Sequence, residues 1–107
     1  MKSHTKLYLE HFEIMPYEAP CEVCGAMSVD VHHIKNRGMG GSKNQDRIEN
    51  LMALCRDHHI ELGDKKQHLQ FLKMVHDAYI EYQLSFAEKY GRKITQWYID
   101  NPNKKML

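Results

Sequence analysis

The sequence predicts a small α+β domain, and three features of the chain support this fold class. Its 107 residues are enough for one domain with a modest core, so residues 1–107 are expected to form a single unit. Hydrophobic residues make up 42% and charged residues 27%, which favours a folded soluble protein over a low-complexity disordered segment. Segments with helical spacing of apolar residues flank a middle part, residues 21–62, that is rich in turn residues, cysteines and histidines.

A helix is predicted at the N-terminal end, over residues 3–15. Ser3 is a suitable N-cap, and Tyr8, Leu9 and Phe12 fall at helical spacing. Prolines at positions 16 and 20 then end the helical pattern, because proline has no backbone N–H to donate.

Two short strands are predicted within the middle part. Residues 27–34 alternate between apolar and polar side chains, and residues 50–54 form a second, more apolar run that leads into Cys55. The glycine-rich stretch 38–42 between them is predicted to be a loop. A short helix is expected after Cys55, ending near Gly63.

A long C-terminal helix is predicted over residues 64 to about 90, with Asp64 as its N-cap and Gly91 as its stop. Its apolar residues recur at spacings of three and four. The residues at this spacing are Leu69, Leu72, Val75 or His76, Tyr79, Tyr82 and Phe86. Four apolar residues beyond Gly91 are expected to pack back on the core, namely Ile94, Trp97, Tyr98 and Ile99.

The charge balance excludes a strongly basic nucleic-acid-binding domain, since the formal net charge is only +1. Any surface that binds nucleic acid must therefore be local. The candidate cations near the middle part are Lys35, Arg37, Lys43, Arg47 and Arg56, with acidic residues among them. No apolar run approaches the roughly 20 residues that span a bilayer, and no signal-peptide pattern follows the N-terminus, so a cytoplasmic protein without a membrane partner is expected.

The cysteines predict a structural zinc site. An odd count of three without a secretion signal argues against a disulfide framework. Cys21-x-x-Cys24 and Cys55-x-x-His58 are two short hooks of equal spacing, and together they offer the three thiolates and one imidazole that suit tetrahedral Zn²⁺. The alternatives are a redox Cys-x-x-Cys motif or three buried apolar cysteines, and neither accounts for the two matching spacings.

Three further histidines form a second candidate group. On a strand, neighbouring side chains point to opposite faces, so His32 and His33 can have different roles. His59 follows His58 directly, and neighbouring helical residues lie about 100° apart, so His58 can face the zinc while His59 faces elsewhere. A neutral histidine suits a general base at neutral pH, and two others can bind a divalent cation, which is a sufficient set for phosphodiester hydrolysis. The remaining histidines, His4, His11, His68 and His76, have no partner at ligand spacing and are expected to be structural.

The order of these motifs resembles that of the HNH, or ββα-metal, endonucleases. The resemblance covers residues 21–59, from Cys21-x-x-Cys24 through Val31-His32-His33-Ile34 and the glycine-rich loop to Asn50 and Cys55-x-x-His58-His59. It implies a treble-clef-like core with a zinc knuckle beside the long helix. It also implies metal-dependent cleavage of DNA that leaves 5′-phosphate and 3′-hydroxyl ends.

The resemblance assigns a role to each matching residue. His33 resembles the general base, and His32 and His59 stand where the family binds its catalytic cation, which would be Mg²⁺, Mn²⁺ or Ni²⁺. Asn50 resembles the middle asparagine, which either orients the base or helps to bind the metal. The commonest knuckle of the family has Cys-x-x-Cys on both hooks, and here His58 replaces the fourth cysteine. Arg37, just after the base, is a candidate phosphate contact.

The implied partner is DNA, and the small architecture resembles nucleases of phages and prophages, whose packaging or recombination proteins are further candidate partners. Two alternatives stay open. A non-catalytic zinc module that binds nucleic acid or a protein would keep the four zinc ligands but would not need His33, Asn50 and His59 together. A nuclease acting on RNA has no distinguishing short motif, and the sequence predicts no oligomeric state.

Overall fold

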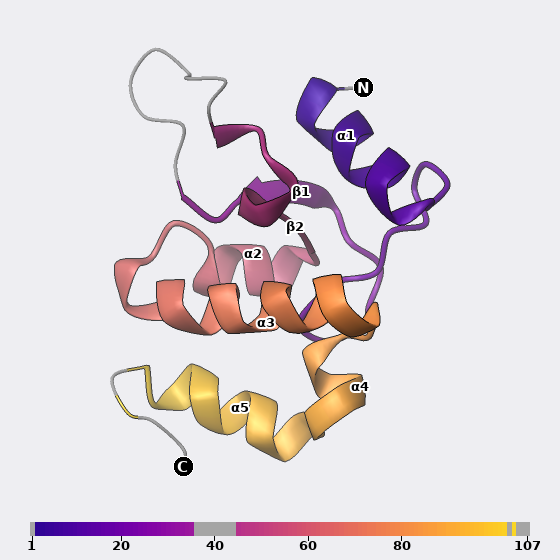
Figure 1. Ribbon diagram of the computed structural model, residues 1–107. Helices are drawn as coiled ribbons and strands as arrows, with labels where there is room; N and C mark the ends of the chain where they lie inside the picture. The colour runs from indigo at the N-terminus through magenta and orange to yellow at the C-terminus, as the bar shows by residue number, and fades with distance from the viewer. Residues whose placement is uncertain (1, 36–44, 103, 105–107) are drawn as a thin grey trace.

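The computed structural model describes residues 2–35, 45–102 and 104, and shows a small α+β fold around a two-stranded antiparallel sheet (Figure 1). In chain order the elements are α1 (Ser3–Phe12), β1 (Asp30–His33), the 3-10 turn η2 (Ile48–Asn50), β2 (Leu51–Leu54), α2 (Arg56–Leu62), the 3-10 turn η3 (Lys66–His68), α3 (Leu69–Tyr82), α4 (Phe86–Tyr90) and α5 (Arg92–Asp100). The coarse α+β prediction is confirmed. Among the described residues, no helix has the length and apolar character to cross a membrane.

The sheet lies between two hydrophobic clusters, so its strands are buried on both faces. β1 and β2 pair so that Asp30 lies opposite Leu54 and His33 opposite Leu51. Every residue of β2 is buried, and its side chains alternate between the clusters. Met52 and Leu54 join the cluster that contains α3 and α4 residues, whereas Leu51 and Ala53 join the cluster that contains α1 residues. Figure 1 accordingly shows α1 above the sheet and α2 and α3 below it.

The first predicted strand is shorter than expected. Residues 27–34 were predicted as a strand, but β1 covers only Asp30–His33, and Met27 makes a single bridge to Pro20. The second strand and the short helix after Cys55 are confirmed as β2 and α2. The predicted loop 38–42, together with Arg37 and Lys43, lies outside the described residues.

The N-terminal helix is confirmed, but its predicted cap is wrong. Lys2 is the N-cap of α1, and Ser3 is already the first helical residue. The helix ends at Phe12 rather than at residue 15, because Glu13 adopts a left-handed conformation with φ of 56° and its amide bonds back to the last turn. Its buried face is His4, Tyr8, Leu9 and Phe12.

The long helix predicted over residues 64–90 is wrong, because the chain forms two helices there. α3 ends at Tyr82, Gln83 turns left-handed with φ of 51°, and Ser85 starts α4 by accepting a hydrogen bond from the Glu88 amide at 3.2 Å. Asp64 is also left-handed, with φ of 60°, and does not cap a helix. The break has a structural reason. It lets two amides at the start of α4 donate to carbonyls of the first zinc hook, as described below.

The C-terminal segment packs on the core as predicted. Ile94, Tyr98 and Ile99 of α5 contact the cluster below the sheet, where the Tyr98 ring stacks on that of Phe71 at a centroid distance of 5.7 Å. Trp97 is half-buried beside Tyr98. Figure 1 shows α4 and α5 as the lowest layer, beneath α3.

A buried polar network joins the two clusters through Glu22, which is fully buried. Oε2 of Glu22 accepts a 2.5 Å hydrogen bond from the Tyr8 hydroxyl, and Oε1 lies 2.8 Å from Nδ1 of His76. Nε2 of His76 donates to the carbonyl oxygen of Ile48 at 2.5 Å. Burial raises the pKa of Glu22. Burial by itself lowers the pKa of His76, but the hydrogen bond and charge of Glu22 outweigh it, so the net pKa of His76 is raised. The network ties α1, the first hook, η2 and α3 together.

Breaking this network should destabilise the fold strongly. His76→Ala leaves a buried carboxyl group without its partner, so the free energy of unfolding should fall by about 3–5 kcal/mol in urea denaturation. Asp77→Ala, at the exposed neighbour on the same helix, is the control and should change it by no more than about 0.5 kcal/mol. The double change Glu22→Leu with His76→Leu should be more stable than His76→Ala. Equal stability of His76→Ala and Asp77→Ala would contradict the role given to the network.

Candidate metal centres

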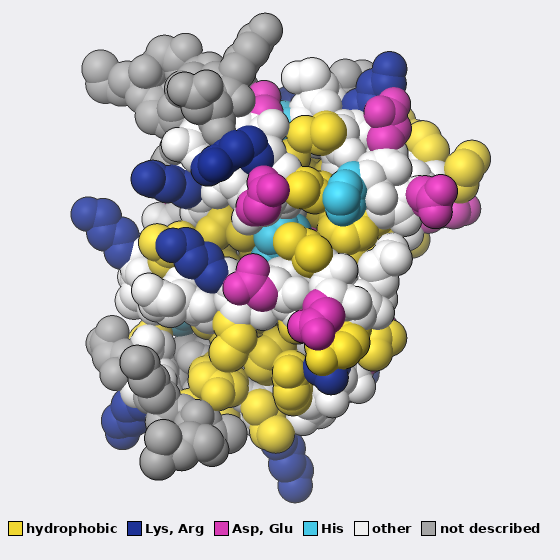
Figure 2. All heavy atoms as spheres, in the orientation of Figure 1, with side chains coloured by type: hydrophobic (Ala, Val, Ile, Leu, Met, Phe, Trp, Pro, Cys, Tyr) yellow, Lys and Arg dark blue, Asp and Glu magenta, His cyan; other side chains and the backbone are white. Residues whose placement is uncertain are grey.

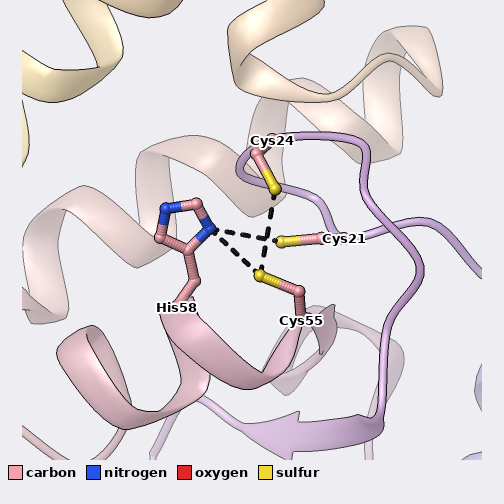
Figure 3. A group of neighbouring side chains, drawn as sticks. All are labelled: Cys21, Cys24, Cys55 and His58. Carbon is pink, nitrogen blue, oxygen red and sulfur yellow. Dashed lines mark hydrogen bonds between the residues drawn. The ribbon is translucent and has the colours of Figure 1, made fainter.

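Two hooks from distant parts of the chain bring Cys21, Cys24, Cys55 and His58 together (Figure 3). Their ligand atoms all lie within 4.8 Å of one another. The Sγ atoms of Cys24 and Cys55 are 3.9 Å apart, and Nδ1 of His58 lies 3.4 Å from Sγ of Cys55 and 3.7 Å from Sγ of Cys21. Figure 3 shows all four side chains pointing toward a common centre.

These separations fit a tetrahedral zinc ion. Zn–S bonds of about 2.3 Å and Zn–N bonds of about 2.0 Å imply ligand separations of roughly 3.5–3.8 Å along the edges of the tetrahedron. The three separations given above lie in or near this range. The four residues predicted as zinc ligands are therefore brought together, and with four protein ligands the site leaves no open coordination position.

Backbone hydrogen bonds shape each hook. The Cys21 amide donates to the Ala26 carbonyl at 2.6 Å, and the Gly25 amide donates to the Cys21 carbonyl at 2.8 Å. Gly25 has φ of +82°, a backbone conformation that favours glycine. Cys55 is the N-cap residue of α2, which places His58 one turn along the helix.

The first hook also holds the start of α4 through backbone hydrogen bonds. The amides of Phe86 and Ala87, at the start of α4, donate to the carbonyls of Glu22 and Val23 at 2.8 and 2.9 Å. Both acceptors lie between the two cysteines of the hook. The position of α4 therefore depends on the shape of this hook.

Burial shifts the pKa values of three of these side chains, Cys21, Cys24 and His58, toward their neutral forms. Burial raises the pKa of the Cys21 thiol to about 12 and also raises that of Cys24, because an isolated thiolate is poorly solvated there. Burial lowers the pKa of His58, which keeps its imidazole neutral and able to coordinate. A bound cation would deprotonate the thiols outright.

Apart from the Cys3His group, two histidines lie close together on the face of the sheet that α2 and α3 cover. His32 of β1 and His59 of α2 have ring centroids 5.1 Å apart. Gly63 makes this approach possible, because a Cβ there would lie 2.5 Å from the main-chain oxygen of His59 and 3.4 Å from Cε1 of His32. The two residues that the family resemblance assigned to one cation are thus neighbours.

His32 carries an unpaired nitrogen. Its Nε2 is buried and has no hydrogen-bond partner within the described part of the chain. Such an atom is costly unless something binds it. Burial lowers the pKa of His32, so the ring is neutral and keeps a lone pair for coordination. His32 thus offers a buried imidazole nitrogen close to the ring of His59.

His33 lies on the opposite face and meets residues that the sequence analysis did not select. Its Nε2 is 2.6 Å from Oδ1 of Asp46, and its ring centroid is 4.5 Å from that of His4. His4 was expected to be merely structural, and Asp46 was counted only among surface charges. A helical-face argument could have placed His4 near the sheet, since it shares the spacing of Tyr8 and Phe12.

Asn50 ties the two ends of the segment between the strands. Its Oδ1 accepts from the Lys35 amide at 2.7 Å, and its Nδ2 donates to the carbonyls of Lys35 and Gln45 at 3.0 and 2.9 Å. Among the described residues, the hydrogen-bond partner of the His33 ring is Asp46 rather than Asn50. The geometry thus gives Asn50 a role in holding the chain on either side of residues 36–44.

A cavity of about 510 Å³ lies along β1, beside the two adjacent histidines of that strand. Its lining includes His32 and His33, together with His4, Asp30 and Asp64. A ligand in this cavity can therefore reach both adjacent histidines of the strand. Arg37, the predicted phosphate contact, lies outside the described residues.

Removal of a zinc ligand should unfold the protein, and not only lower its affinity for zinc. Cys21→Ala or Cys55→Ala should lose bound zinc by mass spectrometry and native ellipticity by circular dichroism, because the metal joins both hooks. The exposed His11→Ala variant is the control and should keep both. A folded, zinc-loaded Cys55→Ala protein would rule out this ligand set.

The adjacent histidines of α2 should respond differently to the same substitution. His58→Cys should keep zinc and fold, since thiolate and imidazole both suit tetrahedral zinc. His59→Cys should keep the zinc but change the pair formed with His32. Loss of the zinc in His59→Cys, but not in His58→Cys, would show that the two histidines have been assigned wrongly.

Comparison with known proteins adds no assignment. No family model, no curated protein and no solved structure matches the chain. The interpretation of the two histidine groups therefore depends on their chemistry and on the motif order in the sequence.

Proposed function

We propose that the protein is a metal-dependent DNA endonuclease with a ββα-metal core. One observation carries the proposal: the rings of His32 and His59 are neighbours, a buried His32 nitrogen has no hydrogen-bond partner among the described residues, and His32 and His33 both line the cavity along β1. The order β1, β2, α2 and the motif order in the sequence support it. A non-catalytic zinc module would have no need for this second group of histidines.

His32 and His59 would hold the divalent cation. When bound, the cation would stabilise negative charge on the phosphate and on the leaving 3′-oxygen. Neither histidine needs to move a proton in this scheme. Their task is to offer neutral nitrogens from a rigid strand and a rigid helix, and Gly63 keeps the space between them free.

His33 would be the general base. With its Nε2–H donating to Asp46, Nδ1 is the nitrogen left to accept a proton from an attacking water. Asp46 would fix this tautomer and stabilise the imidazolium that forms. Asn50 would act at a distance, by holding the chain that carries Asp46 close to the end of β1.

The charge distribution suits contact with a phosphate backbone at one place rather than over a whole face. Lys2 lines the cavity together with the acidic residues Asp30 and Asp64, and Lys35 and Arg47 are exposed on the segment that connects β1 to η2. Figure 2 shows Lys and Arg side chains mainly at the left of the face drawn, and Asp and Glu in its middle and at its right. A local positive edge of this kind can position a nucleic acid without a large net charge.

A plasmid cleavage assay tests the proposal. The zinc-loaded protein should cut plasmid DNA with Mg²⁺, Mn²⁺ or Ni²⁺ and stop cutting when EDTA is added. His33→Ala should bind the catalytic cation as wild type does but cleave at least about 10²-fold more slowly, the usual contribution of a positioned base. His11→Ala should cleave normally. A folded, zinc-loaded protein that cuts neither DNA nor RNA with any of these cations would contradict the proposal, and cleavage of RNA alone would replace its substrate.

A further inference from the structure

A third cluster of metal-ligating side chains lies on the upper face of the sheet. His4 from α1, His33 from β1 and Asp46 from the residues before η2 place one ligand atom each within 4.8 Å of the others. His4 is buried, and the side chains of His33 and Asp46 are only 13% and 15% exposed. Three segments that are remote in sequence therefore converge on one point.

The donors of this cluster are already held in place. Nε2 of His4 lies 3.2 Å from the main-chain oxygen of Val31, which fixes its ring against the strand. His33 is in the middle of the cluster, beside the His4 ring and 2.6 Å from Asp46. A ligand set supported in this way loses little conformational entropy when it binds a cation.

The chemistry of the donors selects the kind of cation. Two imidazoles and one carboxylate suit divalent transition metals such as Zn²⁺, Ni²⁺ or Fe²⁺. Because the cluster borders an open cavity, water can complete the coordination shell.

We propose that His4, His33 and Asp46 form a further site for a divalent transition metal, separate from the two metal sites described above. It lies across the strand from the site of His32 and His59, since adjacent strand residues face opposite sides of the sheet. The cation would replace the proton now shared between His33 and Asp46.

Occupation of this site would switch off the proposed base, and this consequence rests on the function proposed above. A neutral imidazole has one lone-pair nitrogen. If Nε2 of His33 binds the cation, Nδ1 carries the proton and accepts none from water. Excess Zn²⁺ should therefore inhibit cleavage that is supported by Mg²⁺.

Calorimetric titration with Ni²⁺ tests the site without any assay of cleavage. The full zinc-loaded chain is used with His59→Ala, so that the site of His32 and His59 is removed. This protein should still bind one equivalent of Ni²⁺. Adding His4→Gln or Asp46→Asn should weaken that binding at least about 10-fold, the minimum expected when a direct ligand is lost.

Controls separate a specific site from other effects. Adding His11→Gln instead removes an exposed imidazole from the same helix and should leave Ni²⁺ binding unchanged. Zinc content and circular dichroism confirm that each variant is folded, and Asp46→Asn keeps the size of the side chain if His4→Gln disturbs α1. Equal Ni²⁺ affinity in all four proteins would overturn the proposal.

A cleavage arm tests the regulatory consequence. With cleavage measured relative to each protein's own rate in Mg²⁺ without Zn²⁺, His4→Gln should need at least about 10-fold more Zn²⁺ than wild type for half-inhibition. If no protein cleaves but Ni²⁺ binding follows the pattern above, the metal site stands and the proposed function fails. If cleavage is normal and inhibition by Zn²⁺ is the same in wild type and His4→Gln, the inhibitory role is wrong.

Discussion

The approach of the two hooks, Cys21–Cys24 and Cys55–His58, is the constraint on which the other parts of the structure depend. Carbonyls within the first hook bind the start of α4, and Glu22 in the same hook holds Tyr8 of α1 and His76 of α3. The second hook begins α2 and so sets the direction of His59. A Cys3His group of this geometry is compatible with structural zinc, whose binding free energy would add to a small core.

The sheet divides the histidines because both of its faces are buried. His32 pairs with Met52 and lies on the face covered by α2, whereas His33 pairs with Leu51 and lies on the face covered by α1. One residue of difference along the strand therefore leads to two different environments. On one face a buried nitrogen of His32 has no partner in the described part of the chain, and on the other Asp46 and His4 lie beside the His33 ring.

The sequence could predict what depends on local spacing. The two hooks, the paired strands and the separation of His58 from His59 all follow from short intervals along the chain. It could not predict contacts that depend on how α1 crosses the sheet, so His4 and Asp46 were missed. It also missed the break at Gln83, because apolar periodicity continues through Phe86, whereas the amides of Phe86 and Ala87 donate to carbonyls of a segment that is distant in sequence.

The central claim is that one zinc ion closes the two hooks with three sulfurs and one nitrogen. X-ray absorption at the zinc edge of the purified full chain tests this most directly. The account predicts one zinc per chain with three sulfur ligands at about 2.3 Å and one nitrogen ligand at about 2.0 Å. A zinc ion bound only by nitrogen and oxygen, or a folded protein that contains no zinc, would contradict it.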